Sequence, residues 1–354
     1  MSDPNLLYTD VEDDLRASVR ALLSARADGF LARVESDSPH DLDLWRELAA
    51  IGANSLHVPE SAGGQGASWR ETAVVAEELG RSVAPVPFLG STVLATAALM
   101  ACGETDTLTR LASGAATGVL AVPLSTWPGA ALPPITVSDG KLTGTVRSVV
   151  DASVADLFVV PTSFGLYVVE DAQVAPVVSL DMTRPIADVT FAGASGVRIA
   201  DSAQSVVDTA LLTGAGILAS EQVGLAQWCL ELTVDYLKQR YQFGRQVGSF
   251  QSLKHRMADL LQEIVVARAA ARYAADTLAT GDADAPIAVA VAQSLASAVA
   301  VHTAEEAVQL HGGVGMTWEH PLHLFLKRAK ANEIALGTPG RWRMALAPLI
   351  DLPA

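Results

Sequence analysis

The stretch Arg240-Tyr-Gln-Phe-Gly-Arg-Gln-Val-Gly-Ser-Phe-Gln251 separates two segments that are expected to be long helices, 205–240 and 250–280. The first segment holds no proline and few glycines, and at 1.5 Å per residue it could span roughly 50 Å. The stretch therefore predicts a corner between two helices. At such a corner the guanidinium of Arg240 can form paired hydrogen bonds to phosphate oxygens, and glycines let a ligand approach the backbone. A solvated arginine in an ordinary helix–helix turn fits the spacing equally well.

A second motif, Gln309-Leu-His-Gly-Gly-Val-Gly315, follows a further expected helix at 286–310. Adjacent glycines after a helix expose backbone N–H groups, which suit a pyrophosphate or an amide. A helix C-cap followed by a turn is the competing interpretation. A third glycine-rich stretch, Pro59-Glu-Ser-Ala-Gly-Gly-Gln-Gly66, is more typical of a loop between two helices.

The chain divides by composition into three expected domains. Residues 1–115 show helical periodicity, including a helix expected from Trp69 to a C-cap at Gly80. Residues 116–200 are rich in Val, Thr, Pro and Gly, in short runs that are typical of strands bounded by turns. Residues 201–354 return to the helical pattern. The expected fold class is mostly α with a central β domain.

Composition excludes several classes of protein. Of 354 residues, 50% are hydrophobic and 18% charged, which excludes an extended disordered chain. A net charge of -15 argues against a nucleic-acid partner, because phosphate backbones require clustered Lys and Arg. Two cysteines, an acidic N-terminus and a longest apolar stretch of 88–101 indicate no disulfide framework, no signal peptide and no membrane span. We therefore expect a cytoplasmic protein.

Histidines 311, 320 and 323 lie close together in the sequence, but a metal site needs three or four ligands and Glu319 is the only nearby acid. We expect no metal and assign these histidines to a loop and the surface.

Eight short motifs follow one another along the chain. In order they are Leu48-Ala-Ala-Ile-Gly52, Val58-Pro-Glu60, Glu77-Glu-Leu-Gly80, Leu142-Thr-Gly144, Ala155-Asp-Leu-Phe-Val-Val160, Arg240-Tyr-Gln-Phe-Gly244, Gln309-Leu-His-Gly-Gly313 and Gly337-Thr338. In this order the chain resembles the acyl-CoA dehydrogenases over nearly its full length. The resemblance implies an N-terminal helical domain, a middle β barrel or sandwich, and a C-terminal four-helix bundle that contributes to FAD binding and oligomerisation.

The resemblance also implies a reaction. In that family FAD oxidises the Cα–Cβ bond of an acyl-CoA thioester, a Glu carboxylate removes the α-proton, and electrons pass on to an electron-transfer flavoprotein. The family's pyrophosphate-binding Arg corresponds to Arg240, with Gln242 and Phe243 beside it. The family's Gln and second Gly that reach the same cofactor correspond to Gln309 and Gly313.

The segments that correspond to the family's flavin-ring contacts and catalytic base depart from the family pattern. Thr126-Trp-Pro-Gly-Ala-Ala-Leu132 lacks the family's Glu, second Gly and Ser, and Val146-Arg-Ser-Val-Val150 lacks the Trp and Thr that pack on the isoalloxazine. The usual position of the catalytic Glu holds Leu336, and the alternative position holds Gly214. The catalytic base is therefore unassigned.

The nearest acids to Gly214 on its helix are Asp208 and Glu221, six residues before it and seven after it. Seven residues span roughly 10 Å, which is too far for proton abstraction unless the helix is shifted. Both carboxylates are expected to be solvated or to lie at an interface, and both remain weak candidates for the base.

Three hypotheses follow. The leading one is a chain like the smaller subunit of actinobacterial heteromeric acyl-CoA dehydrogenases of fatty acid or sterol side-chain catabolism. It would complete a partner's FAD site, in a heterotetramer, without a base of its own. The second is a self-sufficient homo-oligomer that uses Glu221 or Asp208. The third is a flavin-free structural paralogue that binds partner helices.

Overall fold

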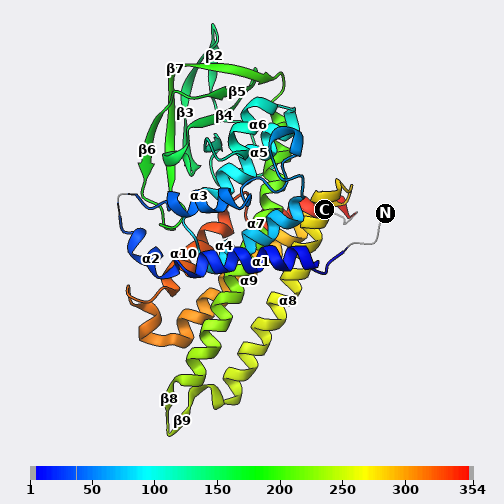
Figure 1. Cartoon of the computed structure of the whole chain (residues 1–354). Coiled ribbons are helices and arrows are strands. Elements are labelled where there is room, and N and C mark those ends of the chain that lie inside the picture. The colour runs from blue at the N-terminus through cyan, green and yellow to red at the C-terminus, as the bar shows by residue number, and fades with distance from the viewer. Residues whose placement is uncertain (1–4, 37, 351–354) are drawn as a thin grey trace.

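The computed structural model describes residues 5–36 and 38–350, and Figure 1 shows a β region at one end of the molecule and long helices running to the other. The helices are α1 (Asp10–Ser24), α2 (Ala27–Arg33), α3 (Leu42–Ala50), α4 (Trp69–Ser82), the π-helical η2 (Phe88–Ala95), α5 (Thr96–Cys102), α6 (Thr105–Ala112), α7 (Gln204–Gln239), α8 (Gln251–Thr280), α9 (Ala285–His311), α10 (Leu322–Ile334) and α11 (Pro339–Leu349). Short 3-10 turns are η1 (Glu60–Ala62), η3 (Ala152–Val154), η4 (Val247–Ser249) and η5 (Gly312–Met316). The strands are β1 (Gly118–Leu120), β2 (Thr136–Ser138), β3 (Lys141–Val150), β4 (Leu157–Thr162), β5 (Gly165–Val169), β6 (Gln173–Val177), β7 (Ile186–Ala200), β8 (Tyr241–Gln242) and β9 (Arg245–Gln246).

The β region is built around β7, which pairs with β3 and β6 along its first part and with β5 along its last. The strand order is β1-β4-β5-β7-β3-β2, with β6 beside β7. This region has an apolar core of its own, in which Phe158 meets Phe191 edge to face at 6.0 Å. The predicted fold class, mostly helical with a central β region, is confirmed. The division at 115/116 and 200/201 into three domains stays a prediction.

The long C-terminal helices were predicted closely. The helix expected from 205 to 240 is α7, whose 36 residues span about 54 Å. The helices expected at 250–280 and 286–310 are α8 and α9, and Pro286 lies in the first turn of α9. The segment Ala285–Met316, which contains α9, is long and apolar enough to cross a membrane, but 72% of its most apolar window is buried inside the protein. This burial fits a core helix.

The expected C-cap at Gly80 was wrong. Helix α4 continues to Ser82 and ends at Val83, a β-branched residue with φ 45°. A Cβ on Gly80 would overlap the carbonyl of Glu221 on α7, and a Cβ on Gly224 of α7 would overlap the carbonyl of Glu77 on α4. The two glycines therefore allow the backbones of α4 and α7 to cross in direct contact, and Gly80 serves packing instead of helix termination.

This crossing predicts opposite effects for two Gly→Ala substitutions. Gly224→Ala should destabilise the protein by roughly 1–3 kcal/mol, because α4 and α7 must move apart, although alanine is the better helix former. Gly29→Ala on α2 is the control, since a Cβ there meets nothing within 4 Å. It should be neutral or stabilise by up to about 1 kcal/mol. Urea denaturation measures both, and equal effects would contradict the crossing.

A buried histidine fastens the loop after α3 to the neighbouring helices. The imidazole of His57 lies 3.0 Å from Thr72 Oγ1 and 2.8 Å from Thr96 Oγ1, and its ring stacks on Trp69 at 3.8 Å. Burial lowers the pKa of His57 to about 3. The fold therefore requires the neutral imidazole, whereas the unfolded chain binds a proton near pH 6.5.

This burial predicts how stability depends on pH. Between pH 6.5 and 3 the unfolded state binds the extra proton, so the His57 contribution is fully present above 6.5 and falls as the solution is acidified. One such proton changes the free energy of unfolding by up to about 1.4 kcal/mol per pH unit. His57→Gln should give a flatter dependence between about pH 7 and 5 by this amount, measured by urea denaturation in matched buffers. Parallel pH profiles for the two proteins would refute it.

Candidate functional site

The predicted corner is an exposed hairpin at the tip of the helices. Strands β8 and β9 pair as Tyr241 with Gln246 and Gln242 with Arg245, and the two residues between them have φ of 54° (Phe243) and 76° (Gly244). Such a turn favours residues that tolerate positive φ, and a phenylalanine there is strained. The Phe243 side chain is 89% exposed. A strained, solvent-exposed aromatic residue at a hairpin tip is typical of a contact site.

Arg240 begins this hairpin, directly after α7 ends at Gln239, and its side chain is exposed. Its backbone is fixed, because its N–H donates to the Tyr236 carbonyl at 2.9 Å and its carbonyl accepts from Val247 N–H at 2.8 Å. The nearby ion pair joins Lys238 to Asp235 at 3.6 Å and does not include Arg240. The guanidinium therefore extends from a rigid corner toward solvent.

The glycine loop lies where α9 gives way to η5. Gly312 has φ 60°, and a Cβ added at Gly312 or Gly313 would meet no atom within 4 Å. Gln309, on the last turn of α9, is exposed as well. Gly312 caps α9 by donating its N–H to the Gln309 carbonyl, which is the competing interpretation, and the space around Gly312 and Gly313 also leaves room for a ligand. A pyrophosphate or amide contact here stays a prediction.

A contact that the sequence did not reveal joins the two motifs. The ring of Tyr236, one turn before Arg240, stacks on His311 at 4.3 Å, and its hydroxyl donates to the His311 carbonyl at 3.4 Å. Two segments about 70 residues apart in the sequence thereby meet. In the sequence, Tyr236 stands four residues before Arg240 and His311 stands directly before the glycines. Neither position indicates that Tyr236 and His311 meet.

The histidines of this region do not form a metal site. His311 is buried, which corrects its assignment to a loop or the surface, and its Nδ1 bonds to the Ala307 carbonyl at 2.8 Å. Burial lowers the pKa of His311, and burial together with the neighbouring His311 lowers the pKa of His320. Both imidazoles are therefore neutral at pH 7, and the positive charge at this corner comes from Arg240 and its exposed neighbours Lys238 and Arg245. Within residues 5–36 and 38–350 no group of three metal-ligating side chains occurs.

The two positions at which the family resemblance implies a catalytic Glu meet in space, and both are filled by apolar groups. A Cβ on Gly214 would lie 2.5 Å from Leu94 Cδ2 and 3.1 Å from Leu336 Cδ1. Leu336 is fully buried, and its N–H donates to the Leu124 carbonyl at 2.8 Å. The space for a carboxylate is occupied by two leucines, so this region contains no proton acceptor at either position.

The loop Thr126–Leu132, which departs from the family motif, packs against the C-terminal segment that contains Gly337 and Arg341. The guanidinium of Arg341 lies over the Trp127 ring, with its Cζ 4.0 Å from the ring centroid, and Trp127 also borders Gly337. Asp208 fixes this loop, because its Oδ1 accepts from Gly129 N–H at 2.7 Å and from the Gln204 amide at 3.0 Å. The Asp208 carboxylate thus has a structural function in joining α7 to the loop.

Glu221 lies in a buried cluster of ion pairs. Its carboxylate is bound by Arg184, by Arg328 Nη1 at 3.0 Å and by the Asn332 amide at 3.0 Å, while Arg328 also binds Asp181. Burial alone would raise the pKa of Glu221, but the two guanidinium groups lower it to about 2. A carboxylate of this pKa is a poor proton acceptor at pH 7. The expectation of a solvated or interface carboxylate was wrong, and the geometry also argues against Glu221 as the base.

Comparisons with known proteins match both helical regions. Residues 9–118 match the model of the acyl-CoA dehydrogenase N-terminal domain, and residues 204–348 match that of the acyl-CoA dehydrogenase C-terminal domain. The chain belongs to the acyl-CoA dehydrogenase family.

Particular relatives cover nearly the whole chain. It is 37% identical over 328 residues to the acyl-CoA dehydrogenase IpdE2 of Mycolicibacterium smegmatis, covering 92% of this chain and 94% of that protein. It is 38% identical over 330 residues to IpdE2 of Mycobacterium tuberculosis, covering 92% of each. Among solved structures, a chain of the ChsE4-ChsE5 complex from Mycobacterium tuberculosis superposes with a TM-score of 0.88 at 26% identity, covering 99% of this chain and 100% of that one. A variant of the Tcur3481-Tcur3483 steroid ACAD gives 0.86 at 26% identity, covering 97% and 98%.

The Glu221 cluster predicts a stability phenotype. Glu221→Gln should destabilise the protein by roughly 3–5 kcal/mol, because it leaves two buried guanidinium groups without their shared partner. Asp235→Asn on the same helix is the control, since both partners of the Asp235–Lys238 pair are about two-thirds exposed, and it should cost less than about 1 kcal/mol. The measurement is urea denaturation at pH 7. A Glu221→Gln protein of unchanged stability would contradict the structural function.

Proposed function

We propose that this chain is a subunit of a heteromeric, FAD-dependent acyl-CoA dehydrogenase and completes the FAD site of a similar partner subunit without a base of its own. One observation carries the proposal: the exposed Arg240 corner and the open glycine loop are held together at the surface, while Leu336 and Leu94 fill the place of the base. A complete dehydrogenase needs both halves, and this chain has one.

The residues proposed to hold the cofactor are Arg240, Gln242, Phe243, Gln309 and Gly313. Arg240 pairs with the pyrophosphate through charge-assisted hydrogen bonds, and the open space at Gly313 lets the same anion approach the loop. Phe243 offers an exposed apolar face beside it. FAD, when bound, supplies the hydride acceptor for α,β-dehydrogenation of an acyl-CoA thioester.

The partner subunit supplies the carboxylate that removes the α-proton and the residues that face the flavin ring. Support comes from the similar ChsE4-ChsE5 complex and Tcur3481-Tcur3483 steroid ACAD, each of which pairs two components. Because the second is a steroid ACAD, we favour a sterol side-chain thioester over an ordinary fatty acyl-CoA as the substrate. An electron-transfer flavoprotein in the cytoplasm is the proposed electron acceptor.

The other two hypotheses fit the structure less well. A self-sufficient homo-oligomer would need Glu221 or Asp208 as its base, but Glu221 is bound by two arginines and Asp208 holds the Gly129 loop. A flavin-free scaffold gives no reason for an arginine and an open glycine loop fixed side by side at the surface.

The proposal predicts flavin content. The chain expressed alone should purify with little or no flavin absorbance, and co-expression with a longer family member that carries the Glu should yield a yellow complex. In that complex Arg240→Gln should lower the FAD affinity by at least tenfold, because a charged hydrogen-bond donor to phosphate contributes roughly 1.5–3 kcal/mol. Lys238→Gln, an exposed cation two residues away, should leave FAD binding within about twofold.

Absorbance of the flavin bands and FAD titration of the apo-complex measure these effects. Stoichiometric FAD and turnover of acyl-CoA by the isolated chain would refute the half-site proposal. Unchanged FAD content in an Arg240→Gln complex would instead favour the scaffold.

A further inference from the structure

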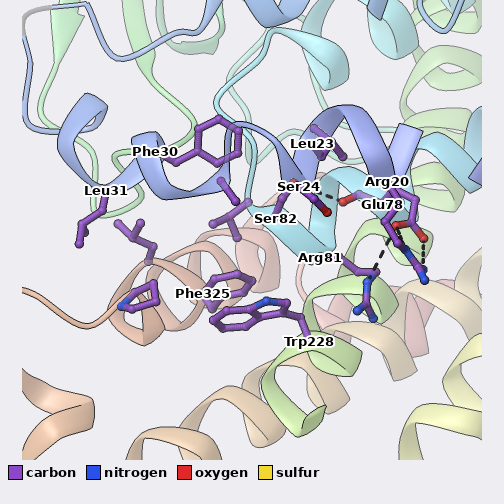
Figure 2. A pocket seen from close by; sticks show the side chains of 14 residues that line it. Arg20, Leu23, Ser24, Phe30, Leu31, Glu78, Arg81, Ser82, Trp228 and Phe325 are labelled. Carbon is purple, nitrogen blue, oxygen red and sulfur yellow. Dashed lines mark hydrogen bonds and ion pairs between the residues drawn. The ribbon is translucent and has the colours of Figure 1, made fainter. Parts of the chain in front are cut away.

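A cavity lies beside the crossing of α4 and α7, away from the residues proposed to hold FAD. It has a volume of about 370 Å³ and is enclosed by five helices, α1, α2, α4, α7 and α10 (Figure 2). This volume falls within the roughly 300–1,000 Å³ range of small-molecule sites. None of the residues proposed to hold FAD lines it.

One side of the hollow is apolar and rigid. Trp228 of α7 and Phe325 of α10 stack in parallel at 3.6 Å, and Figure 2 shows Phe30 of α2 facing them across the cavity. Phe30 and Phe325 are nearly inaccessible to solvent, 2% and 3% exposed. The packed aromatic wall offers a flat surface to a hydrocarbon or ring system, which gains free energy by leaving water.

The other side is cationic. Arg20 of α1 binds both oxygens of Glu78, at 2.7 and 2.6 Å, so the one carboxylate lining the cavity is already neutralised. Arg81 of α4 donates through Nη2 to Glu231 at 2.6 Å, and its Nε lies 3.9 Å from Glu78 Oε2, whereas among the described residues its Nη1 has no hydrogen-bond acceptor. A guanidinium has five N–H donors, so Arg81 retains capacity for an anionic oxygen.

From this arrangement we propose that the cavity binds an apolar carboxylate, with its hydrocarbon body against Trp228 and Phe325 and its carboxylate on Arg81. An uncharged ligand would leave the Nη1 of Arg81 without an anionic acceptor. A strongly polar one would lose the aromatic wall. The inference is independent of the proposed function, since the cavity shares no residue with the FAD half-site.

The test uses the full chain with three small molecules. Anilinonaphthalene sulfonate is the fluorescent anionic probe, dodecanoate the carboxylate competitor and phenylnaphthylamine the neutral probe. We expect one saturable site per chain for the anionic probe, displaced by dodecanoate. Arg81→Gln should weaken the anionic probe about tenfold and the neutral probe less than twofold, and Arg81→Lys should restore part of the loss.

Ala27→Phe should abolish binding of both probes, because this exposed position of α2 lines the cavity and a benzyl group would fill it. Ser24→Phe, exposed on α1, fills the cavity from the other wall should Ala27→Phe impair folding. Arg46→Gln, an exposed ion-pair residue of α3, is the control and should bind as wild type.

Probe binding that survives both filling substitutions would overturn the proposal. So would probe binding that disappears on assembly with a partner subunit while Ala27→Phe weakens assembly, because the cavity would then be a subunit contact.

Discussion

The buried ion-pair cluster around Glu221 is the interaction on which the placement of the β region against the helices depends. Two guanidinium groups reach it from different parts of the chain, Arg184 from the segment before β7 and Arg328 from α10. Asp181 balances the second arginine, so two acids and two bases are enclosed together. Buried charges are tolerated when they are paired and hydrogen-bonded, and here the pairing fastens the β region to α7 and α10 in one geometry.

The same principle recurs where α4 crosses α7. Gly80 and Gly224 let the backbones touch, and the acids beside this crossing, Glu77 and Glu78, are neutralised by arginines from α1 and α8. Although the chain has a net charge of -15, several of its arginines form ion pairs with buried carboxylates. Arg240 is an exception, since among the described residues its guanidinium forms no ion pair. Arg81 pairs with Glu78 and Glu231 but keeps its Nη1 without a protein acceptor among the described residues.

This distribution shows how the family fold keeps its shape without a Glu at either position where the resemblance implies a base. The places where the resemblance implies a base are closed by Leu94 and Leu336, which add apolar packing to α7 and require no charge. The corner proposed to bind the cofactor, by contrast, adds nothing to the core: Phe243 is strained and exposed, and Gly312 and Gly313 face open space. Residues that weaken a fold locally are retained where they bind something, which is why the corner carries the functional argument.

The sequence by itself determined the lengths of α7, α8 and α9, the central β region, the corner at Arg240 and the absence of a Glu at position 336 or 214. These features are local, because helix periodicity, the placement of proline and glycine, and residue identity depend on residues that are close together in the sequence. Tertiary structure alone decided that Gly80 is a crossing point, that Tyr236 meets His311, and that Glu221 binds two arginines. Each of these pairs residues at least 37 positions apart, and their meeting is set by how the elements pack, which no local pattern encodes.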